Sequence, residues 1–277
     1  MSVTSVESAV ERCLEVLQNR PSGLFSDFDG TLSAIASTPD AARPYAGAER
    51  AVERINERVD EFAIITGRAA DDALAMLGLP DIRVIGNHGL EMIYRGEHTA
   101  NPVGVAAIAN VERSMDEIRT ELSAQVDPVG MVFENKRYSA SIHYRNTPKP
   151  DVIEEALRPL VLQSAHDHDL RITGGKMMFE LRPKVVISKG TALADVINEF
   201  ALKGVIFIGD DVTDVDGFEV LHSVAESQGV NVLAVGVMSE ETHPSVLEHS
   251  DILLSGVGDT VEMLTQLANR LEKTGDA

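Results

Sequence analysis

The chain has a single cysteine, few basic residues and no long apolar run, and each shortage excludes a class of protein. With Cys13 alone, the chain forms no internal disulfide and carries no cysteine-based zinc site. No uncharged apolar stretch approaches the roughly 18 residues that a membrane span needs. Residues 1–20 mix charged with apolar side chains, which excludes the apolar core of a signal peptide and indicates an amphipathic helix. We therefore expect a soluble, cytoplasmic protein.

Basic residues are outnumbered by acidic ones, 24 against 44, so the net charge is −20, and only seven of the basic residues are lysines. Nucleic acids and anionic membranes are bound mainly through Lys and Arg, so we expect neither as a partner. We interpret the excess acid as a solvated, solubilising surface in preference to a functional acidic patch. An anionic substrate would need positive charge concentrated at its site.

The 277 residues exceed the usual size of a single hydrophobic core, which predicts one large domain or two smaller ones. A hydrophobic share of 44% and a charged share of 25% are typical of a globular protein and exclude a disordered one. Short apolar runs alternate with stretches of helical periodicity; they lie at 23–26, 62–65, 84–85, 205–208 and 231–235. This alternation predicts an α/β fold with a doubly wound, mainly parallel, Rossmann-like core.

The middle of the chain follows another pattern. Residues 106–122 and 150–166 have helical spacing, whereas 131–134 and 139–144 resemble a hairpin pair of strands. Alternation of apolar and polar residues over 139–144 suits a sheet with one solvated face. We predict an α+β insert at about 103–182, within a core formed by 1–102 and 183–277.

Polar residues follow four of the apolar runs, at Asp27, Thr66, Asn87 and Asp210. The carboxyl ends of parallel strands form the ligand crevice of an open sheet, so we expect these distant residues to converge there.

Carboxylates dominate this predicted crevice. Asp27 and Asp29 are two residues apart, which puts them on the same side of an extended chain. They would repel each other unless one is protonated or a cation lies between them. Asp210, Asp211 and Asp214 add further carboxylates, and ligands that are all oxygen favour Mg²⁺ over zinc. Helix capping or turn formation would explain any one of these residues, but explains the whole set poorly.

Lys189 stands at the start of a predicted helix over 191–200. A lysine there opposes the helix dipole, so it is locally unfavourable unless it serves another purpose. Beside a metal and a carboxylate cluster it would offset the charge of a phosphoryl group. The alternative is a solvated surface lysine.

Four ordered motifs resemble the haloacid dehalogenase superfamily of aspartate-nucleophile phosphatases: Asp27-Phe28-Asp29-Gly30-Thr31, Ile65-Thr66-Gly67-Arg68, Lys189 and Gly209-Asp210-Asp211-Val212-Thr213-Asp214. A finer resemblance is to the trehalose-6-phosphate phosphatase family. It depends on Gly86-Asn87-His88-Gly89-Leu90-Glu91, Glu134-Asn135-Lys136, His143-Tyr144-Arg145, the segment 175–183 and the continuation of the last motif to Phe218. Together these motifs span residues 24–220.

The resemblance implies hydrolysis of trehalose 6-phosphate in two displacements. Asp27 would attack phosphorus to form an aspartyl-phosphate. Asp29 would protonate the leaving sugar oxygen and then take a proton from the attacking water. Thr66 would bond a phosphoryl oxygen, and Lys189 would neutralise charge in the transition state.

The resemblance also implies Mg²⁺, with the ligand set Asp27, Asp29 (through its backbone carbonyl), Asp210 and Asp214, the last through bound water. Val215 departs from the family, which usually shows an acidic residue there. We expect this change to alter the charge around the metal more than the chemistry.

The insert would then be a cap that closes over the core and excludes water. The implied substrate-binding residues are Arg68, Asn87 and His88 on the core and Glu134, Lys136, Arg145 and Glu180 on the cap. Lys136, Arg145 and Lys176 would supply the positive charge that an anionic substrate needs. Charged residues on a solvated sheet face are the alternative for the cap set, and His88 is equally consistent with a structural histidine.

Other functions remain open at this point. A phosphatase of another sugar phosphate, such as sucrose 6-phosphate or mannosyl-3-phosphoglycerate, would share the core motifs and differ only in the cap. A phosphomutase is disfavoured because it must exclude water. A non-catalytic sugar-phosphate sensor would be favoured by loss of Asp27, Asp29 or Lys189, and all three are present. We expect a monomer with a small-molecule sugar phosphate as its partner.

Overall fold

A computed structural model describes residues 2–175, 177–240 and 242–275 of the chain. The chain divides into two compact units. The first comprises the residues up to Ala36, Ala41–His98 and the residues from Ile187 onward, and the second comprises Ser37–Asp40 and Thr99–Val186. The second unit therefore extends four residues beyond each end of the predicted insert, 103–182, and adds a short segment from the N-terminal part. Within the described residues, no helix is both long and apolar enough to cross a membrane.

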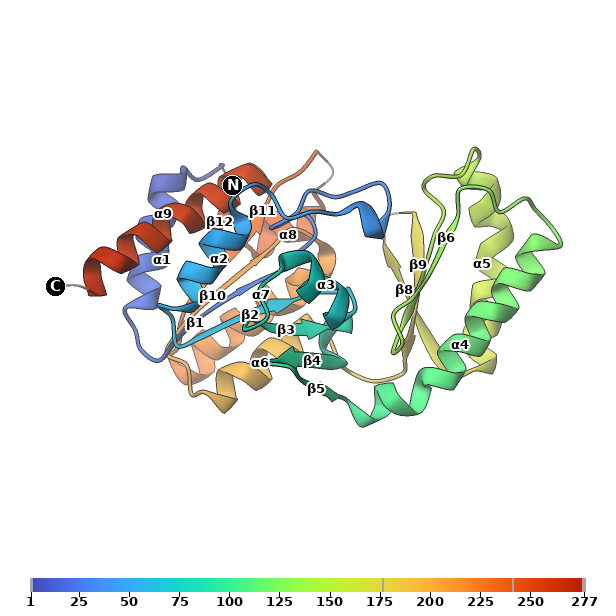
Figure 1. Cartoon of the computed structure of the whole chain (residues 1–277), viewed down its shortest axis with the longest axis horizontal. Coiled ribbons are helices and arrows are strands. Elements are labelled where there is room, and N and C mark those ends of the chain that lie inside the picture. Colours follow the sequence, from blue (N-terminus) through green and yellow to red (C-terminus); the bar gives the residue numbers. More distant parts are fainter. Residues whose placement is uncertain (1, 176, 241, 276–277) are drawn as a thin grey trace. The chain divides into compact units, whose positions relative to one another are not determined.

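The first unit contains an eight-stranded sheet in the order β12-β11-β10-β1-β2-β3-β4-β5 (Figure 1). Its strands are β1 (Ser22–Ser26), β2 (Glu61–Ile65), β3 (Arg83–Gly86), β4 (Glu91–Tyr94), β5 (Glu97–Ala100), β10 (Gly204–Gly209), β11 (Asn231–Val237) and β12 (Ile252–Leu254). The pairs from β12 across to β3 are parallel, and β4 lies antiparallel to β3. Strand β1 is central, with Ser26 opposite both Ile208 and Ile64, so chain segments nearly two hundred residues apart end side by side.

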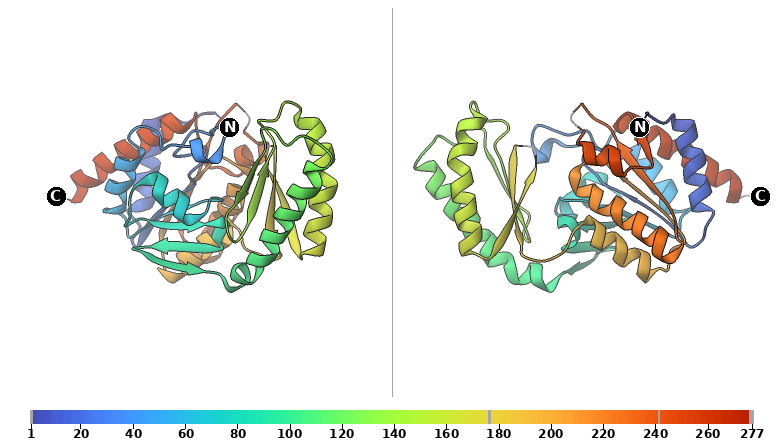
Figure 2. Two further views of the ribbon diagram at one scale, coloured as in Figure 1. Left: turned by 45° about the vertical axis from the view of Figure 1, so that its right-hand side comes forward. Right: turned by 180° about the vertical axis from the view of Figure 1, so that it is seen from behind.

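Helices cover both faces of this sheet, which explains why its strands are continuous apolar runs. One face packs against α1 (Val6–Leu17), α2 (Ala48–Asn56), α3 (Ala70–Leu77) and α9 (Val257–Gly275), and the other against α6 (Lys189–Glu199), α7 (Val212–Gln228) and α8 (Pro244–His249) (Figures 1 and 2). Leu24 and Ile206 face the first group, whereas Phe25 and Phe207 face the second, as the alternation of side chains along a strand requires. The predicted doubly wound, mainly parallel α/β core is confirmed.

Cys13 lies fully buried on α1, among the side chains of the first of these helical layers. Burial raises the pKa of its thiol to about 12, so it is a packing residue without thiolate character.

The second unit is a four-stranded antiparallel sheet in the order β6-β7-β9-β8, with two helices on one face. Its strands are β6 (Val132–Asn135), β7 (Ala140–His143), β8 (Leu170–Gly175) and β9 (Met178–Pro183), and its helices are α4 (Pro102–Ser123) and α5 (Pro150–Asp167). Ala140, Ile142 and Leu181 point to the helices and form their own hydrophobic core with them.

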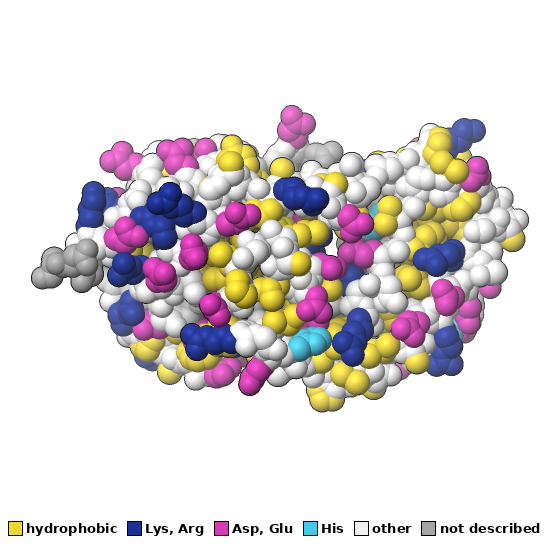
Figure 3. All heavy atoms as spheres, in the orientation of Figure 1, with side chains coloured by type: hydrophobic (Ala, Val, Ile, Leu, Met, Phe, Trp, Pro, Cys, Tyr) yellow, Lys and Arg dark blue, Asp and Glu magenta, His cyan; other side chains and the backbone are white. Residues whose placement is uncertain are grey.

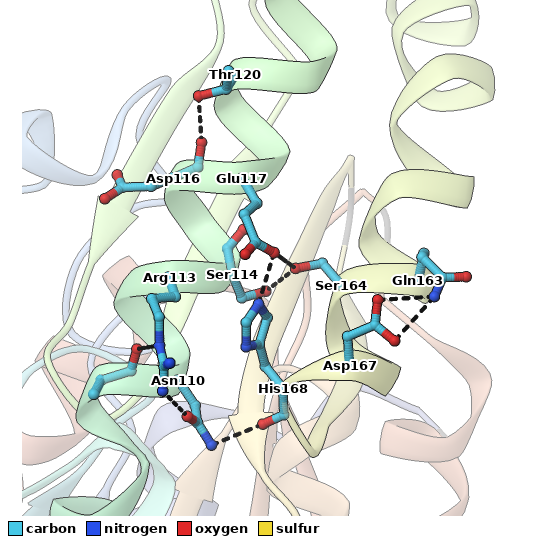
Figure 4. Close-up of polar contacts among 11 residues, drawn as sticks. Asn110, Arg113, Ser114, Asp116, Glu117, Thr120, Gln163, Ser164, Asp167 and His168 are labelled. Carbon is cyan, nitrogen blue, oxygen red and sulfur yellow. Dashed lines mark hydrogen bonds and ion pairs between the residues drawn. The ribbon is translucent and has the colours of Figure 1, made fainter.

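Polar contacts fix α4 against α5 on the helical side of the second unit (Figure 4). The Ser114 and Ser164 hydroxyls lie 2.8 Å apart in the buried interface. One turn further along, the Glu117 carboxylate lies 2.7 Å from the His168 ring nitrogen. Asn110 donates to the backbone carbonyl of His168. These contacts hold the helical layer to one side of the sheet and leave the polar side chains of the strands on the other.

That other face is polar, and its side chains range from buried to partly exposed; Glu134 and His143, for example, are 19% and 26% exposed. Ser139, Ser141, Glu180 and Arg182 are each no more than 4% exposed. Some polar groups of the face bond to one another; Thr173 on β8, for example, donates to the Glu180 carboxylate on β9. A pattern of alternating residues identifies the two faces of a strand, but it does not say whether polar side chains bond to water or to each other.

The surface view agrees with a dispersed, solubilising role for the excess acid. On the face drawn in Figure 3, acidic side chains lie scattered among basic and apolar ones and do not gather into one patch.

Candidate active site

Three carboxylates meet where β1 and β10 end. Asp27 directly follows β1 and Asp210 directly follows β10, and Asp214 lies in the first turn of α7. One oxygen from each of these side chains lies within 4.8 Å of the others, and all three residues are buried. The convergence expected from the parallel arrangement of the strands is therefore present.

Lys189 lies inside this cluster. Its Nζ is 2.7 Å from an oxygen of Asp27 and 2.8 Å from an oxygen of Asp214, and the residue is only 3% exposed. Ser188 caps α6 with its hydroxyl and thereby fixes the helix start at Lys189. The alternative of a solvated surface lysine is wrong.

One ammonium group does not balance three buried carboxylates. Burial raises the pKa of Asp27 to about 8, against the opposing pull of Lys189. Burial and the charge of Asp27 raise the pKa of Asp210 well above its usual range. Burial lowers the pKa of Lys189, but the carboxylates of Asp214 and Asp27 outweigh that effect and raise it. The cluster lacks positive charge, and its oxygen donors fit a hard divalent cation.

The three carboxylates are not equally available to a cation. Both oxygens of Asp214 already accept hydrogen bonds: Oδ1 from Lys189 at 2.8 Å, and Oδ2 from the backbone N–H groups of Asp210 and Asp211 at 3.1 Å each. Asp214 therefore supports Lys189 and the loop that carries Asp210. Asp27 and Asp210 are the better direct ligands.

Gly30 lets the turn after Asp29 approach Asp210. Its φ is +79°, and a Cβ added there would lie 2.0 Å from an Asp210 carboxylate oxygen. The neighbouring Thr31 hydroxyl donates to the other oxygen of that carboxylate.

Gly30→Ala is expected to lower kcat about a hundredfold, because it forces both a strained backbone and a displaced Asp210 carboxylate. The measurement is phosphate release with saturating Mg²⁺, the activity and the cation that the resemblance of the motifs implies. Gly229→Ala is the control: that glycine also has a positive φ, 68°, but a Cβ added there meets nothing within 4 Å. Equal losses of activity in the two variants would contradict this account of Gly30.

Asp29 forms an ion pair with Arg68. The guanidinium donates from Nε at 2.6 Å and from Nη2 at 2.7 Å, one bond to each carboxylate oxygen. Arg68 also lies over the Phe28 ring, 5.7 Å from its centroid. The sequence suggested a substrate contact for Arg68, and the structure adds this contact with the second aspartate of the first motif.

Two loops of the first unit carry the remaining predicted core residues. Thr66 is 1% exposed, and its hydroxyl accepts a hydrogen bond from the Arg68 N–H. Asn87 and His88 form the next loop, where the Asn87 N–H donates to the Arg68 carbonyl at 2.7 Å and the His88 N–H to the Thr66 carbonyl at 2.9 Å. The loop after β2 and the loop after β3 are thus bonded together along their length.

Three of the four predicted cap residues gather on the polar face of the second unit. The Lys136 ammonium forms a buried ion pair with Glu180. Glu134 on β6 and Glu180 on β9 both lie opposite Ser141 on β7, and Glu134 contacts His143 at 3.1 Å. Arg145 lies exposed in the turn after β7. Lys176 is outside the described residues.

Sequence reasoning missed Ser141. Its side-chain oxygen is buried and has no hydrogen-bond partner among the residues that the structure describes. Its place between Ala140 and Ile142, in a run where polar and apolar residues alternate, was the available signal.

The family model described as trehalose-phosphatase matches residues 25–248. The chain belongs to the trehalose-phosphatase family. A trehalose-phosphate phosphatase of Mycobacterium avium (strain 104) is 37% identical over 224 residues, which is 78% of this chain and 55% of that protein. The chain thus spans about half the length of the curated relatives that it matches.

Solved structures agree on the fold of this trehalose-phosphatase family member. A trehalose-6-phosphate phosphatase related protein aligns with a TM-score of 0.75 at 24% identity, covering 91% of this chain and 99% of that one. The C-terminal domain of trehalose-6-phosphate phosphatase from C. albicans aligns with a TM-score of 0.77 at 22% identity, covering 96% and 97%. The resemblance drawn from the motifs is confirmed at the level of family and fold.

Proposed function

We propose that this protein is a phosphatase that hydrolyses trehalose 6-phosphate to trehalose and phosphate. The observation that carries the proposal is the buried group of Asp27, Asp210, Asp214 and Lys189 after β1 and β10, in a chain of the trehalose-phosphatase family.

Asp27 is the nucleophile in this proposal. Its carboxylate attacks phosphorus, the bond to the sugar oxygen breaks, and an aspartyl-phosphate remains on the enzyme. Water then attacks the phosphorus and releases phosphate. Lys189, held by Asp27 and Asp214, orients the nucleophile and neutralises charge that builds up on the phosphoryl oxygens.

Asp29 is the general acid and base. It gives a proton to the departing sugar oxygen in the first step and takes one from the attacking water in the second. Its side chain is 35% exposed, whereas that of Asp27 is only 6% exposed, so Asp29 is the member of the pair that can exchange protons with solvent. The bidentate contact with Arg68 sets its orientation.

Mg²⁺ is the proposed cofactor, with the Asp27 and Asp210 carboxylates and the Asp29 backbone carbonyl as its ligands. When bound, it neutralises the negative charge that otherwise keeps a carboxylate away from a phosphate. Thr66 donates its hydroxyl to a phosphoryl oxygen.

The polar face of the second unit is the proposed sugar-binding surface. Glu134, Lys136 and Glu180 offer charged hydrogen-bonding groups, and the buried Ser141 hydroxyl offers a further one. Hydrogen bonds from charged side chains to hydroxyls are among the stronger ones, and a disaccharide needs many. Asn87, His88, Arg68 and Arg145 complete the proposed substrate-binding set.

All proposed catalytic groups come from one chain, and we propose that it acts as a monomer on a small-molecule substrate. A single cysteine, held as a buried thiol, suits a reducing compartment, and we propose the cytoplasm.

The test is phosphate release with Mg²⁺ from trehalose 6-phosphate, sucrose 6-phosphate, glucose 6-phosphate, mannosyl-3-phosphoglycerate and p-nitrophenyl phosphate. A strong preference for trehalose 6-phosphate is the expected result. Preference for another sugar phosphate would leave the proposed catalytic core standing and overturn the assignment of the substrate.

Glu180→Gln is expected to lower kcat/KM for trehalose 6-phosphate at least about tenfold and to leave hydrolysis of p-nitrophenyl phosphate within about threefold. The aryl ester has no sugar hydroxyls, so it loses no contact. Glu117→Gln is the matched control, because Glu117 lies on α4 on the other side of the sheet, in contact with His168 (Figure 4). Equal losses on both substrates would remove Glu180 from sugar recognition.

A further inference from the structure

The mechanism above gives no role to Glu91, a buried charged group of the first unit. Glu91 is the first residue of β4 and is 5% exposed. Its Oε1 accepts hydrogen bonds from the Ala70 N–H at 3.0 Å and from the Asn87 side-chain amide at 2.5 Å. Its Oε2 lies 2.8 Å from Nε2 of His98.

The contact with Ala70 replaces a missing helix cap. Ala70 is the first residue of α3, and the preceding residue, Ala69, has no side-chain oxygen that could accept from the helix N-terminus. The Glu91 carboxylate supplies that oxygen from another strand, and its negative charge suits the helix dipole. It therefore fixes the end of the loop that begins at Thr66 and contains Arg68.

The contact with Asn87 holds a strained turn. Asn87 and His88 have φ values of 49° and 57°, so two successive residues other than glycine adopt the left-handed conformation. Such a turn persists only when its surroundings hold it in place. The Asn87 side chain is held by the same Glu91 oxygen that caps α3, so one atom joins the two loops.

The two loops also approach too closely for ordinary side chains. A Cβ on Gly86 would lie 2.4 Å from the Ala70 nitrogen, and one on Gly67 would lie 2.7 Å from the His88 ring. Movement of the Glu91 carboxylate would therefore shift both loops, and with them the Thr66 hydroxyl and the Arg68 guanidinium that orients Asp29.

We propose that Glu91 is a positioning residue: through Ala70 and Asn87 it holds the Thr66–Arg68 loop in the geometry that the phosphoryl group and Asp29 require. This inference rests on the proposed function. It predicts an effect on kcat for every phosphate ester, because the loop acts on the phosphoryl group and not on the sugar.

Glu91→Ala in the full chain with Mg²⁺ is expected to lower kcat at least about tenfold on both p-nitrophenyl phosphate and trehalose 6-phosphate, with KM for the former changed less than about threefold. Glu91→Gln is expected to recover most of the loss, because its amide oxygen still accepts from Ala70 and Asn87. If Glu91 only stabilised the fold, Glu91→Ala would lower Tm without lowering kcat at a nearly unchanged KM.

Glu61→Ala is the matched control for lost stability. Glu61 begins β2 and contacts the buried Arg83, the first residue of β3, at 3.3 Å, so this pair lies at the opposite ends of these strands from the loops. This variant is expected to lower Tm while leaving kcat within about twofold. Equal kcat in Glu91→Ala and Glu61→Ala, at matched folded fraction, would overturn the proposal.

Glu91→Leu fills the space of the glutamate side chain but offers no oxygen to accept the hydrogen bonds of Ala70 and Asn87. If Glu91→Ala fails to fold, a wild-type kcat in Glu91→Leu overturns the inference. Amide hydrogen exchange at Ala70 and His88 is expected to accelerate in whichever of Glu91→Ala and Glu91→Leu folds. It is not expected to accelerate in Glu61→Ala. Unchanged exchange in the Glu91 variant would also overturn the inference. If the wild-type protein hydrolyses p-nitrophenyl phosphate but not trehalose 6-phosphate, the proposed substrate is refuted. The role of Glu91 would still be tested by kcat on p-nitrophenyl phosphate and by amide hydrogen exchange.

Discussion

Replacing Asp27 by asparagine is expected to lower kcat for phosphate release at least about a thousandfold, because an amide cannot act as the nucleophile. The two side chains have nearly equal volumes, so the buried packing after β1 should persist. Asp195→Asn is the control; its carboxylate is exposed on α6, and we expect kcat within about twofold of wild type. Retention of more than about a tenth of the wild-type kcat by Asp27→Asn would contradict the covalent mechanism.

The same variant has an expected signature in stability. Burial raises the pKa of Asp27 from 3.8 to about 8, so without metal the folded protein holds a proton that the unfolded chain releases. The contribution of this group to stability therefore falls as the pH rises from 3.8 through about 8. Asparagine does not titrate. Metal-free Asp27→Asn should thus have a higher Tm than wild type at pH 8, with the difference shrinking toward pH 4. A difference that grows toward low pH would contradict this account.

Removal of the divalent cation with EDTA is expected to lower activity at least about a thousandfold, and Mg²⁺ should restore it. Without the cation, burial raises the pKa of Asp27 to about 8 and that of Asp210 well above its usual range, so the proposed nucleophile is largely protonated and cannot attack phosphorus. Turnover that survives exhaustive chelation would contradict the assignment of this cluster to a metal.

Thermal unfolding gives a readout of the cation that does not depend on turnover. A cation at about a hundred times its Kd stabilises the folded state by about 2.7 kcal/mol, so wild type should gain Tm on addition of Mg²⁺. Asp27→Asn and Asp210→Asn should gain less, because each removes a ligand. The exposed Asp195→Asn should respond like wild type. Equal Mg²⁺ shifts in all four proteins would place the cation elsewhere.

The convergence of the core residues was predictable because it depends on the ends of parallel strands. Asp27, Thr66, Asn87 and Asp210 each follow an apolar run, and the sheet brings their backbones to one edge irrespective of side-chain detail. The last two strands at one side of the sheet, β4 and the edge strand β5, were missed. They are short, and the residues of β5 are mostly polar and exposed, so they lack the apolar run that marks an inner strand.

The pairings within the site were not predictable in the same way. That Lys189 is buried between Asp27 and Asp214, or that Arg68 contacts Asp29, depends on rotamers and on the close approach of loops. Glu91 was visible only as the end of a motif, since nothing in the local sequence shows that Ala70 needs an acceptor. In the second unit, the alternation of apolar and polar residues identified the two faces of the sheet. It did not show that Lys136 and Glu180 form a buried ion pair with each other.

The position of β1 between β2 and β10 sets an order of events during synthesis. Asp27, the proposed nucleophile, emerges from the ribosome 162 residues before Lys189 and 183 before Asp210, and the central strand lacks its neighbour β10 until then. The four-stranded sheet with α4 and α5 lies almost entirely within Thr99–Val186, so its chain is available to fold first, as a unit. The carboxylates of Asp27, Asp210 and Asp214 therefore cannot come together until the start of α7 has been made.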